Sequence, residues 1–133
     1  MVLLDTNILS EPLRKTQQRK VYARLGIQAE NFAASVVSLG ELRFGARLHP
    51  QPAQLWSKIE ETVLPLVHWV QIDQAVALKG ADIRAYLHRK GETAGTSDCL
   101  IAATALLNDW TLVTRNTNHF KHVPDLRLEN WFN

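Results

Sequence analysis

Short runs of apolar residues alternate along the chain with longer segments whose apolar residues recur at helical spacing. The runs at 2–4, 32–37, 67–72 and 111–114 are predicted to be buried strands, and a last short strand is expected near 126–128. Buried strands that are separated by helices are typical of a parallel sheet covered on both faces. Because such crossovers are right-handed, the pattern predicts a three-layer α/β/α sandwich with a central, mainly parallel sheet of about four or five strands.

Helical segments are predicted between these strands. The first is broken or kinked around Pro12, because proline cannot continue a helix interior. Ser38 and Ser97 are expected to begin helices, and Asp73 is expected to cap a long one. The predicted helical ranges are 7–25, 38–48, 52–63, 74–89 and 97–107, and residues 90–96 are predicted to form a loop.

The composition is typical of one globular domain. The chain has 133 residues, of which 46% are hydrophobic and 21% are charged. Its apolar runs are far shorter than the ~18–20 residues of a membrane-spanning helix, and its start lacks the basic region of a secretory signal. The single cysteine, Cys99, excludes an internal disulfide and a cysteine zinc cluster. We therefore expect a single domain over 1–133, a cytoplasmic location and no membrane partner.

Basic residues are clustered along the sequence. Fifteen Lys and Arg against thirteen Asp and Glu give a formal charge of +2, which decides little alone. The clusters lie at 14–15, 19–24, 43–47, 88–90 and 115–122. An acidic pocket inside such a basic rim would suit a polyanion that is held by its phosphates around a metal ion. Solvated helix faces with scattered Lys and Arg would give the same pattern.

Acidic residues fall where the predicted strands end. Asp5 follows the first strand, Glu41 comes shortly after the second, and Asp98 lies at the start of the helix before the fourth. Functional sites of parallel sheets lie outside the carboxyl ends of the strands, so these acids should converge. Clustered carboxylates repel one another unless a cation compensates, and hard oxygen ligands suit Mg²⁺ or Mn²⁺. The arrangement predicts metal-assisted hydrolysis of a phosphodiester.

Each acid also has a purely structural interpretation. Glu41 lies three residues after a serine, which is the spacing of a capping box. Asp98 could complement the dipole of its helix. Asp5 could belong to an ordinary helix start that is capped by Thr6 or Asn7. These interpretations do not explain why three acids fall at one edge of the sheet, so the site is the better interpretation of the three together.

Four segments, spread over nearly the whole chain, match the motifs of a known family. They are LLDTNILS at 3–10, SLGELRFGA at 38–46, SDCLIAATA at 97–105 and LVTRNTNHF at 112–120. In these segments the chain resembles the PIN-domain ribonucleases, and specifically the VapC toxins of type II toxin–antitoxin systems. Each segment alone is a weak signal, whereas the four in this order and spacing are specific.

The resemblance implies a set of site residues. Asp5 and Asp98 would be the principal Mg²⁺ ligands, and Glu41 would hold the metal directly or through water. Asn116 lies where many relatives supply a fourth acid, and it is included as a fourth catalytic position. His119 stands where some relatives have Asp or Glu. An amide adds no charge, so one metal ion is expected, with Mn²⁺ as an alternative to Mg²⁺.

Other residues of the motifs have subsidiary interpretations. The resemblance implies that Asn7 and Ser38 orient the carboxylates. His119 could act as a general acid, but a loop residue that contacts RNA or nothing is the more ordinary interpretation. Cys99 is expected to be a small buried hydrophobic residue, because no histidine is spaced to activate it. Trp56, on an amphipathic helix, is a candidate interface residue.

The resemblance implies an endoribonuclease, a hydrolase of ester bonds, that acts on RNA. tRNA is the expected substrate, with the anticodon region of initiator tRNA as one candidate. The resemblance also implies a homodimer and neutralisation by a VapB-type antitoxin, through which the pair would contact operator DNA. One alternative is a catalytically weak PIN fold that serves as a protein- or RNA-binding module. A receiver-like signalling domain fits poorly, because it requires paired acids after the first strand and a lysine after the last, where this sequence has Asp5-Thr6 and Arg115.

Overall fold

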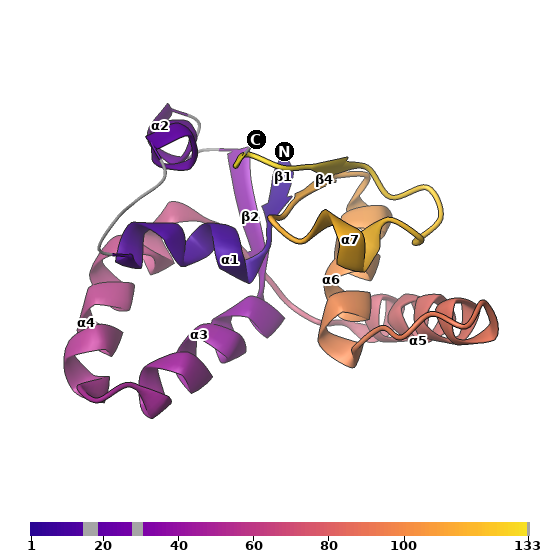
Figure 1. Ribbon diagram of the computed structural model, residues 1–133, viewed down its shortest axis with the longest axis horizontal. Coiled ribbons are helices and arrows are strands. Elements are labelled where there is room, and N and C mark those ends of the chain that lie inside the picture. Colours follow the sequence, from indigo (N-terminus) through magenta and orange to yellow (C-terminus); the bar gives the residue numbers. More distant parts are fainter. Residues whose placement is uncertain (15–18, 28–30, 133) are drawn as a thin grey trace.

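The described residues form a central parallel sheet of five strands. The computed structural model describes residues 1–14, 19–27 and 31–132 (Figure 1). All neighbouring strands in this sheet are parallel, in the order β3-β2-β1-β4-β5. The strands are β1 (Val2–Leu4), β2 (Phe32–Ser35), β3 (His68–Val70), β4 (Thr111–Val113) and β5 (Leu128–Glu129). The predicted parallel sheet is confirmed.

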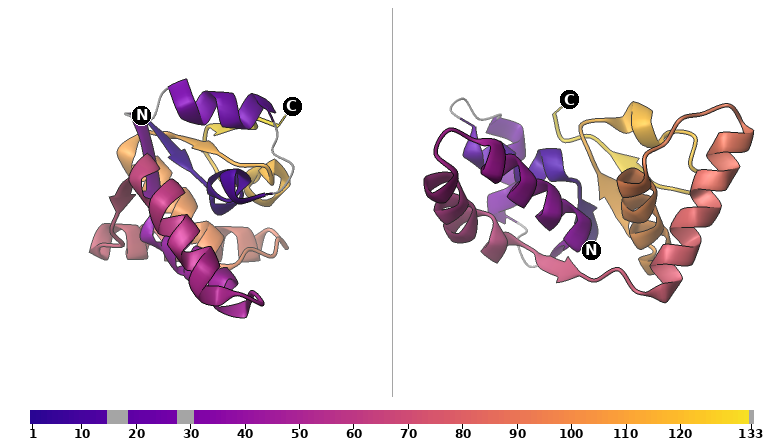
Figure 2. Two further views of the ribbon diagram at one scale, coloured as in Figure 1. Left: turned by 90° about the vertical axis from the view of Figure 1, so that its left-hand side faces the viewer. Right: turned by 90° about the horizontal axis from the view of Figure 1, so that it is seen from below.

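Helices cover both faces of this sheet, as the right-hand view of Figure 2 shows. One face carries α1 (Thr6–Leu9), α2 (Arg19–Ile27), α3 (Val36–Leu48) and α4 (Pro52–Thr62). The opposite face carries α5 (Gln74–Arg89), α6 (Thr96–Asn108) and α7 (Thr117–Phe120), and 3₁₀ turns lie at Glu11–Leu13 and Leu64–Leu66. The three-layer α/β/α sandwich is thereby confirmed. Within the described ranges, these helices are too short or too polar to cross a membrane.

Two hydrophobic cores, one on each face of the sheet, follow from the alternation of side chains along the strands. Leu3 and Leu112 pack into the core beneath α5 and α6, whereas their neighbours Leu4 and Val113 pack into the core beneath α1 to α4. All four side chains are completely buried. Strands that are buried on both faces appear in a sequence as continuous apolar runs, which is why the hydrophobic pattern located them.

The second strand and the helix after it differ from the prediction. β2 ends at Ser35 rather than Val37, and α3 begins at Val36 rather than Ser38. The Ser35 hydroxyl oxygen accepts a hydrogen bond from the Val37 N–H at 3.0 Å, so Ser35 is the residue that caps this helix. Ser38 lies inside α3 and is fully buried. The predicted capping box of Ser38 and Glu41 is therefore wrong.

The other boundaries differ less. Asp73 caps α5 as predicted, because its Oδ1 accepts from the Val76 N–H at 2.9 Å. α6 begins at Thr96, one residue before the predicted start, and the last strand is two residues further along than expected. The predicted helix at 7–25 is divided into α1, a 3₁₀ turn that contains Pro12, and α2. Residues 15–18 of that range lie outside the described residues.

α5 and α6 pack closely against each other at Gly80. A Cβ at this position would lie 3.0 Å from Cδ2 of Leu100 on α6, so a larger residue would force the two helices or the Leu100 side chain to shift. Asp98 lies in the first turn of α6. The contact at Gly80 therefore helps to fix the position of Asp98 relative to the sheet edge.

Candidate active site

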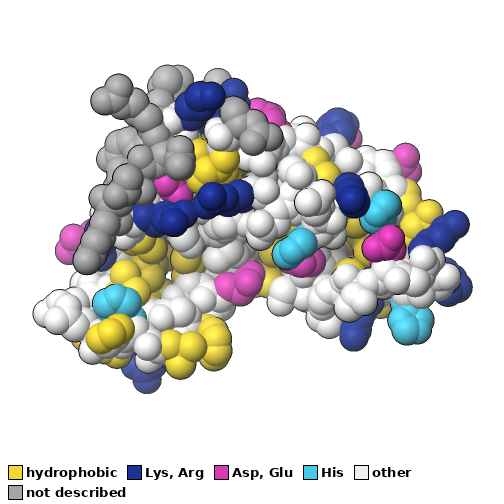
Figure 3. Space-filling view, in the orientation of Figure 1, with side chains coloured by type: hydrophobic (Ala, Val, Ile, Leu, Met, Phe, Trp, Pro, Cys, Tyr) yellow, Lys and Arg dark blue, Asp and Glu magenta, His cyan; other side chains and the backbone are white. Residues whose placement is uncertain are grey.

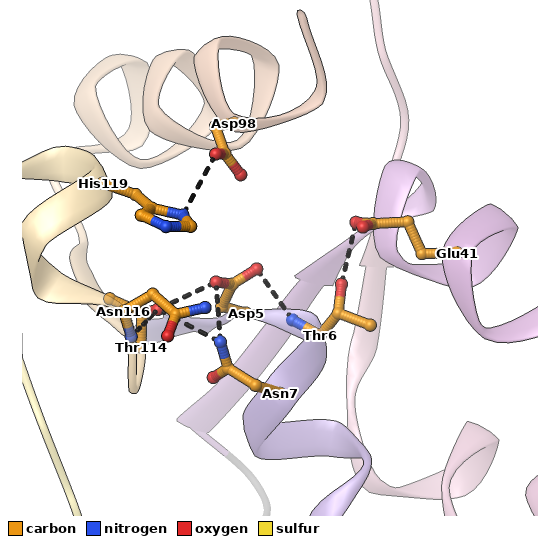
Figure 4. Close-up of polar contacts among 8 residues, drawn as sticks. All are labelled: Asp5, Thr6, Asn7, Glu41, Asp98, Thr114, Asn116 and His119. Carbon is orange, nitrogen blue, oxygen red and sulfur yellow. Dashed lines mark hydrogen bonds and ion pairs between the residues drawn. The ribbon is translucent and has the colours of Figure 1, made fainter. Parts of the chain in front are cut away.

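Asp5 lies directly beyond β1 and is 6% exposed. Its backbone N–H donates to the Val113 carbonyl at 2.9 Å, which continues the pairing of β1 with β4. Its Oδ1 accepts from the Thr6 N–H at 2.8 Å, and its Oδ2 accepts from Thr114 Oγ1 at 2.8 Å and from Asn7 Nδ2 at 3.3 Å (Figure 4). The three donors fix the orientation of this carboxylate. Asp5 itself caps α1, whereas the structural interpretation of the sequence assigned this cap to Thr6 or Asn7.

The segment after β4 is tied to α1 by the same residues. Thr114 Oγ1 accepts from the Asn116 N–H at 3.0 Å, and Asn7 Oδ1 accepts from the Arg115 N–H at 3.0 Å. Asn7 thus holds both the Asp5 carboxylate and the backbone beyond β4. Thr114 therefore links the Asn116 backbone to the Asp5 carboxylate. The sequence placed Asn116 at this edge, and the structure puts it there.

Glu41 reaches the site from the second turn of α3. Thr6 Oγ1 lies 2.9 Å from Glu41 Oε1 and 2.9 Å from Ser38 Oγ. A hydroxyl carries one proton, so when Thr6 donates to the Glu41 carboxylate it accepts from the Ser38 hydroxyl. Ser38 and Thr6 therefore orient Glu41. The role of Ser38 agrees with the sequence resemblance, whereas the contribution of Thr6 was missed.

Asp98 approaches from the opposite helical layer. Its Oδ2 lies 3.6 Å from Nδ1 of His119, which belongs to the short helix α7. In Figure 4 the carboxylates of Asp5, Glu41 and Asp98 point toward a common space beyond the end of β1. Sequence reasoning did not predict α7, and so it did not place the His119 ring against Asp98. The dipole interpretation of Asp98 stays compatible with its place in the first turn of α6.

The three acids interact electrostatically. Burial raises the pKa of Glu41, and the charges of Asp5 and Asp98 raise it further, against the hydrogen bond from Thr6. Burial also raises the pKa of Asp98, and so does the charge of Asp5, whereas His119 lowers it. Both ionised carboxylates are thus destabilised in the folded protein. A bound cation would relieve this repulsion, which is the relation predicted from the sequence.

The donor set fits a hard divalent cation that keeps much of its water. Among the described residues, no group of three or more His, Cys, Asp or Glu side chains is arranged to hold a metal ion by itself. Mg²⁺ is typically bound through one or two carboxylates together with several waters and substrate phosphates, so it does not need such a cage. Carboxylates that are oriented by hydroxyl, amide and backbone donors meet this requirement.

A cavity of about 310 Å³ opens beside Asp98. Its lining includes residues 92–95, Asn118, His119 and His122. Nε2 of His122 lies 3.4 Å from Oε1 of Glu92 on the facing segment. The sequence identified neither this pair nor the cavity, because Glu92 and His122 are thirty residues apart and belong to no common motif. The cavity leaves room for a group beside Asp98, the one of the three acids that lines it.

The fold and the motifs define the class of this protein. The PIN domain family model matches residues 2–126. The chain is 36% identical to Toxin FitB of Neisseria gonorrhoeae, over 90% of this chain and 91% of that protein. It is 33% identical to Ribonuclease VapC2 of Rickettsia felis and 33% identical to the tRNA(fMet)-specific endonuclease VapC of Shigella flexneri, in each case over 97% of this chain and 96% of the relative. The chain belongs to the PIN-domain family.

Solved structures place the chain more closely within that family. The crystal structure of FitAcB from Neisseria gonorrhoeae matches with a TM-score of 0.89 and 34% identity, over 100% of this chain and 99% of that one. The structure of VapBC2 from Rickettsia felis, bound to a DNA fragment from its promoter, matches with a TM-score of 0.88 and 32% identity, over 98% and 99%. The resemblance of the motifs to those of the VapC toxins is confirmed.

Proposed function

We propose that the protein is a Mg²⁺-dependent endoribonuclease and the toxin of a type II toxin–antitoxin pair. The observation that carries this proposal is the convergence of Asp5, Glu41 and Asp98 beyond the carboxyl end of β1 in a PIN fold. Neighbouring charges and burial destabilise two of these carboxylates, which a structural cap would not require. The names of the VapC relatives as ribonucleases and endonucleases support the same activity.

Each residue of the candidate site would have a distinct role in this reaction. Asp5 and Asp98 would hold Mg²⁺ or Mn²⁺, and Glu41 would bind it directly or through water. When bound, the ion supplies electrostatic stabilisation of the negative charge that develops during phosphodiester hydrolysis. Thr114 and the Thr6 N–H keep Asp5 aimed at the site, and the Thr6 hydroxyl holds Glu41. Asn116 would contact the metal or the substrate without adding charge, which favours one metal ion.

tRNA is the proposed substrate, and the anticodon region of initiator tRNA is the most specific candidate. The Shigella flexneri and Salmonella typhimurium relatives are both named tRNA(fMet)-specific endonuclease VapC. The candidate site is recessed at a sheet edge, so a single-stranded loop with unstacked bases can reach it more easily than a duplex can. Arg115 follows β4, and its backbone N–H donates to Asn7 beside Asp5; its guanidinium lies over the Phe132 ring, from which it would have to turn to bind a phosphate.

A VapB-type antitoxin is the proposed partner. The structures with TM-scores of 0.86 to 0.89 are of FitAB or VapBC pairs, and three of these pairs are bound to DNA. By analogy, the antitoxin would neutralise this protein and would link it to operator DNA. The free toxin would be a cytoplasmic homodimer, which sedimentation of the antitoxin-free protein tests directly.

The decisive experiment is cleavage of total tRNA by antitoxin-free protein with Mg²⁺ or with EDTA. Asp98→Asn is the test variant. Asp82→Asn, which removes an exposed carboxylate from the middle of α5, is the matched control. We expect discrete fragments from the wild type and from Asp82→Asn with Mg²⁺, and none from Asp98→Asn or with EDTA. Fragments that persist in both Asp98→Asn and EDTA would refute the metal mechanism.

The second candidate function is a binding module with little catalytic activity. Asn116, which adds no charge at the fourth position, favours it. This function predicts that the folded protein binds RNA or an antitoxin with wild-type affinity but releases no fragments under any metal condition. The same cleavage experiment, combined with a binding measurement, separates the two functions.

A further inference from the structure

A groove of about 760 Å³ lies between α5 and the start of α6, next to the candidate active site. Residues 92–94 line this groove and also line the smaller cavity that contains Asp98. The two hollows therefore share a wall, and a chain that leaves the active site along this side would enter the groove. Nothing in the proposed reaction uses this groove.

The floor of the groove is made of small and apolar side chains. On α5 the buried residues are Val76, Gly80, Ile83 and Leu87, which face the core. The exposed alanines at 77, 81 and 85 lie on an adjacent face of the same helix and line the groove, together with Leu100 from α6. This floor is wide enough for flat, apolar groups, because the alanines project little from the helix.

The sides of the groove are basic. Arg84, His88 and Arg89 line it from the second half of α5, and Glu92 is an acid on the same wall. Glu92 lies 3.4 Å from His122, so its charge is directed toward a histidine. Figure 3 shows Lys, Arg and His side chains at this end of the molecule, with acidic side chains among them.

These charges select between two possible occupants. A second copy of the chain that packed this same groove against its own about a two-fold axis would offer one lining acid, Glu92, to the basic residues Arg84, His88 and Arg89, so most of their charge would lack a partner. A nucleic acid strand has the opposite requirements, because its phosphates need cations and its bases need flat apolar surface. The basic sides and the alanine floor fit the strand.

We propose that the groove carries the single-stranded RNA that flanks the cleaved phosphate on one side. Arg84 and Arg89 bind its phosphates and act as positioning residues, and its bases lie against Ala81 and Leu100. The inference rests on the proposed function and extends it, because it assigns a path to the substrate beyond the cavity at Asp98. It predicts that RNA too short to reach the groove binds more weakly than RNA that fills it.

The test measures RNA binding in the Asp98→Asn protein, which does not cleave under the proposed mechanism. The probe is a fluorescein-labelled 15-nucleotide RNA of mixed sequence, titrated at several salt concentrations. The test variant adds Arg84→Ala and Arg89→Ala. The matched control adds Lys58→Ala and Lys79→Ala, which remove two exposed positive charges that do not line the groove.

Each phosphate contact with a single strand contributes about 0.7 to the slope of log affinity against log salt, so two lost contacts should shrink the affinity change between ~50 and ~200 mM salt about sevenfold. The control should keep the parent slope. Equal slopes for the test and control variants would overturn the inference. If the slopes are equal but the wild type still cleaves tRNA, the inference about the groove is overturned and the proposed function survives. If the Asp98→Asn protein binds no RNA and the wild type cleaves none, the inference and the proposed function are both overturned.

A second variant tests the floor and the competing occupant. Ala81→Glu places a negative charge on an exposed position of α5, so the protein should fold normally. We expect weaker RNA binding and an unchanged sedimentation coefficient. A change from dimer to monomer would show that the groove joins two copies of the chain, and it would overturn the assignment to RNA.

Discussion

Neutralising Asp5 should destabilise the protein and neutralising Asp98 should not, although both substitutions should abolish cleavage. The Asp5 carboxylate accepts hydrogen bonds from the Thr6 N–H, from Thr114 Oγ1 and from Asn7 Nδ2. In Asp5→Asn, one of the two oxygens becomes an NH₂ group. If the remaining oxygen stays with the Thr6 N–H, the new donor faces the Asn7 Nδ2 donor and the Thr114 hydroxyl, which already accepts from the Asn116 N–H.

The magnitude follows from these contacts. A hydrogen bond to a charged group contributes about 1.5–3 kcal/mol, and a buried donor left without an acceptor costs about 1–3 kcal/mol. Relief of the repulsion from Glu41 and Asp98 offsets part of this loss. We therefore expect Asp5→Asn to lower the free energy of unfolding by about 2 kcal/mol, or roughly 6–8 °C in Tm for a domain of this size.

Asp98→Asn should leave stability unchanged or raise it. Burial and the charge of Asp5 both raise the pKa of Asp98, so folding destabilises its ionised form. The substitution loses the contact with His119. The His119 side chain is 59% exposed and the Asp98 side chain is 35% exposed. An ion pair of this kind contributes about 0–1 kcal/mol.

The assay is urea unfolding and calorimetry of the metal-free proteins at pH 7, with Asp82→Asn as the control for loss of an exposed charge. Asp5→Asn should be the least stable of the four proteins, and Asp98→Asn should be at least as stable as Asp82→Asn. Equal losses in Asp5→Asn and Asp98→Asn would refute the reasoning, since the two carboxylates would then contribute alike to the fold.

Three further predictions use the same site. In a thermal melt, Mg²⁺ at 100 times its Kd should stabilise the wild type by about 2.7 kcal/mol and should stabilise Asp98→Asn by much less. An equal gain in both proteins would show that Mg²⁺ binds outside the candidate site. The pKa values of Glu41 and Asp98 are raised in the folded state, so their ionised forms lower the stability of the protein above those pKa values. As the pH falls toward the ordinary values of 4.5 and 3.8, the metal-free wild type should therefore gain stability relative to the Glu41→Gln/Asp98→Asn double variant. A loss of stability relative to that variant would contradict the direction of the pKa shifts. Ser35→Ala should cost about 1 kcal/mol in urea unfolding through loss of the cap of α3, and no measurable cost would show that Ser35 does not cap it.

The sequence predicted the architecture because the strands are buried on both faces and the helices between them are long. The predicted start of α3, at Ser38, is two residues too late because the pairing of β2 with β3 decides where β2 ends. Ser35 is still paired with Val70 of β3, so the strand ends where its partner ends, and a local pattern does not contain that information. The hydrophobic pattern predicted Ser35 inside the strand and Ser38 as the start of the helix, whereas the register of the sheet makes Ser35 the cap. α7 was missed because a helix of four residues has no periodicity to detect.

The site was predictable as a set of acids but not as an arrangement. The convergence of Asp5, Glu41 and Asp98 follows from the topology of a parallel sheet, which the hydrophobic pattern already implies. The contacts that orient these acids join distant parts of the chain. Thr114 and Asp5 are 109 residues apart in sequence, and Thr6 and Glu41 are 35 apart. Neither pairing has a local signature, so the hydroxyl groups that aim the carboxylates are visible only in the folded protein.

Structural and chemical roles are not alternatives at Asp5, although the sequence presents them as such. Its Oδ1 caps α1 through the Thr6 N–H, while its Oδ2 is held by the side chains of Thr114 and Asn7. The cap fixes one end of the carboxylate and the two side chains fix the other, so the group keeps its orientation before any ion arrives. Glu41 and Asp98 lack such a set of donors in the described contacts and are destabilised by the charge of Asp5. The site thus combines one acid that is fixed by the fold with two acids whose ionised forms are destabilised in the fold, and a bound cation would relieve the repulsion on Glu41 and Asp98.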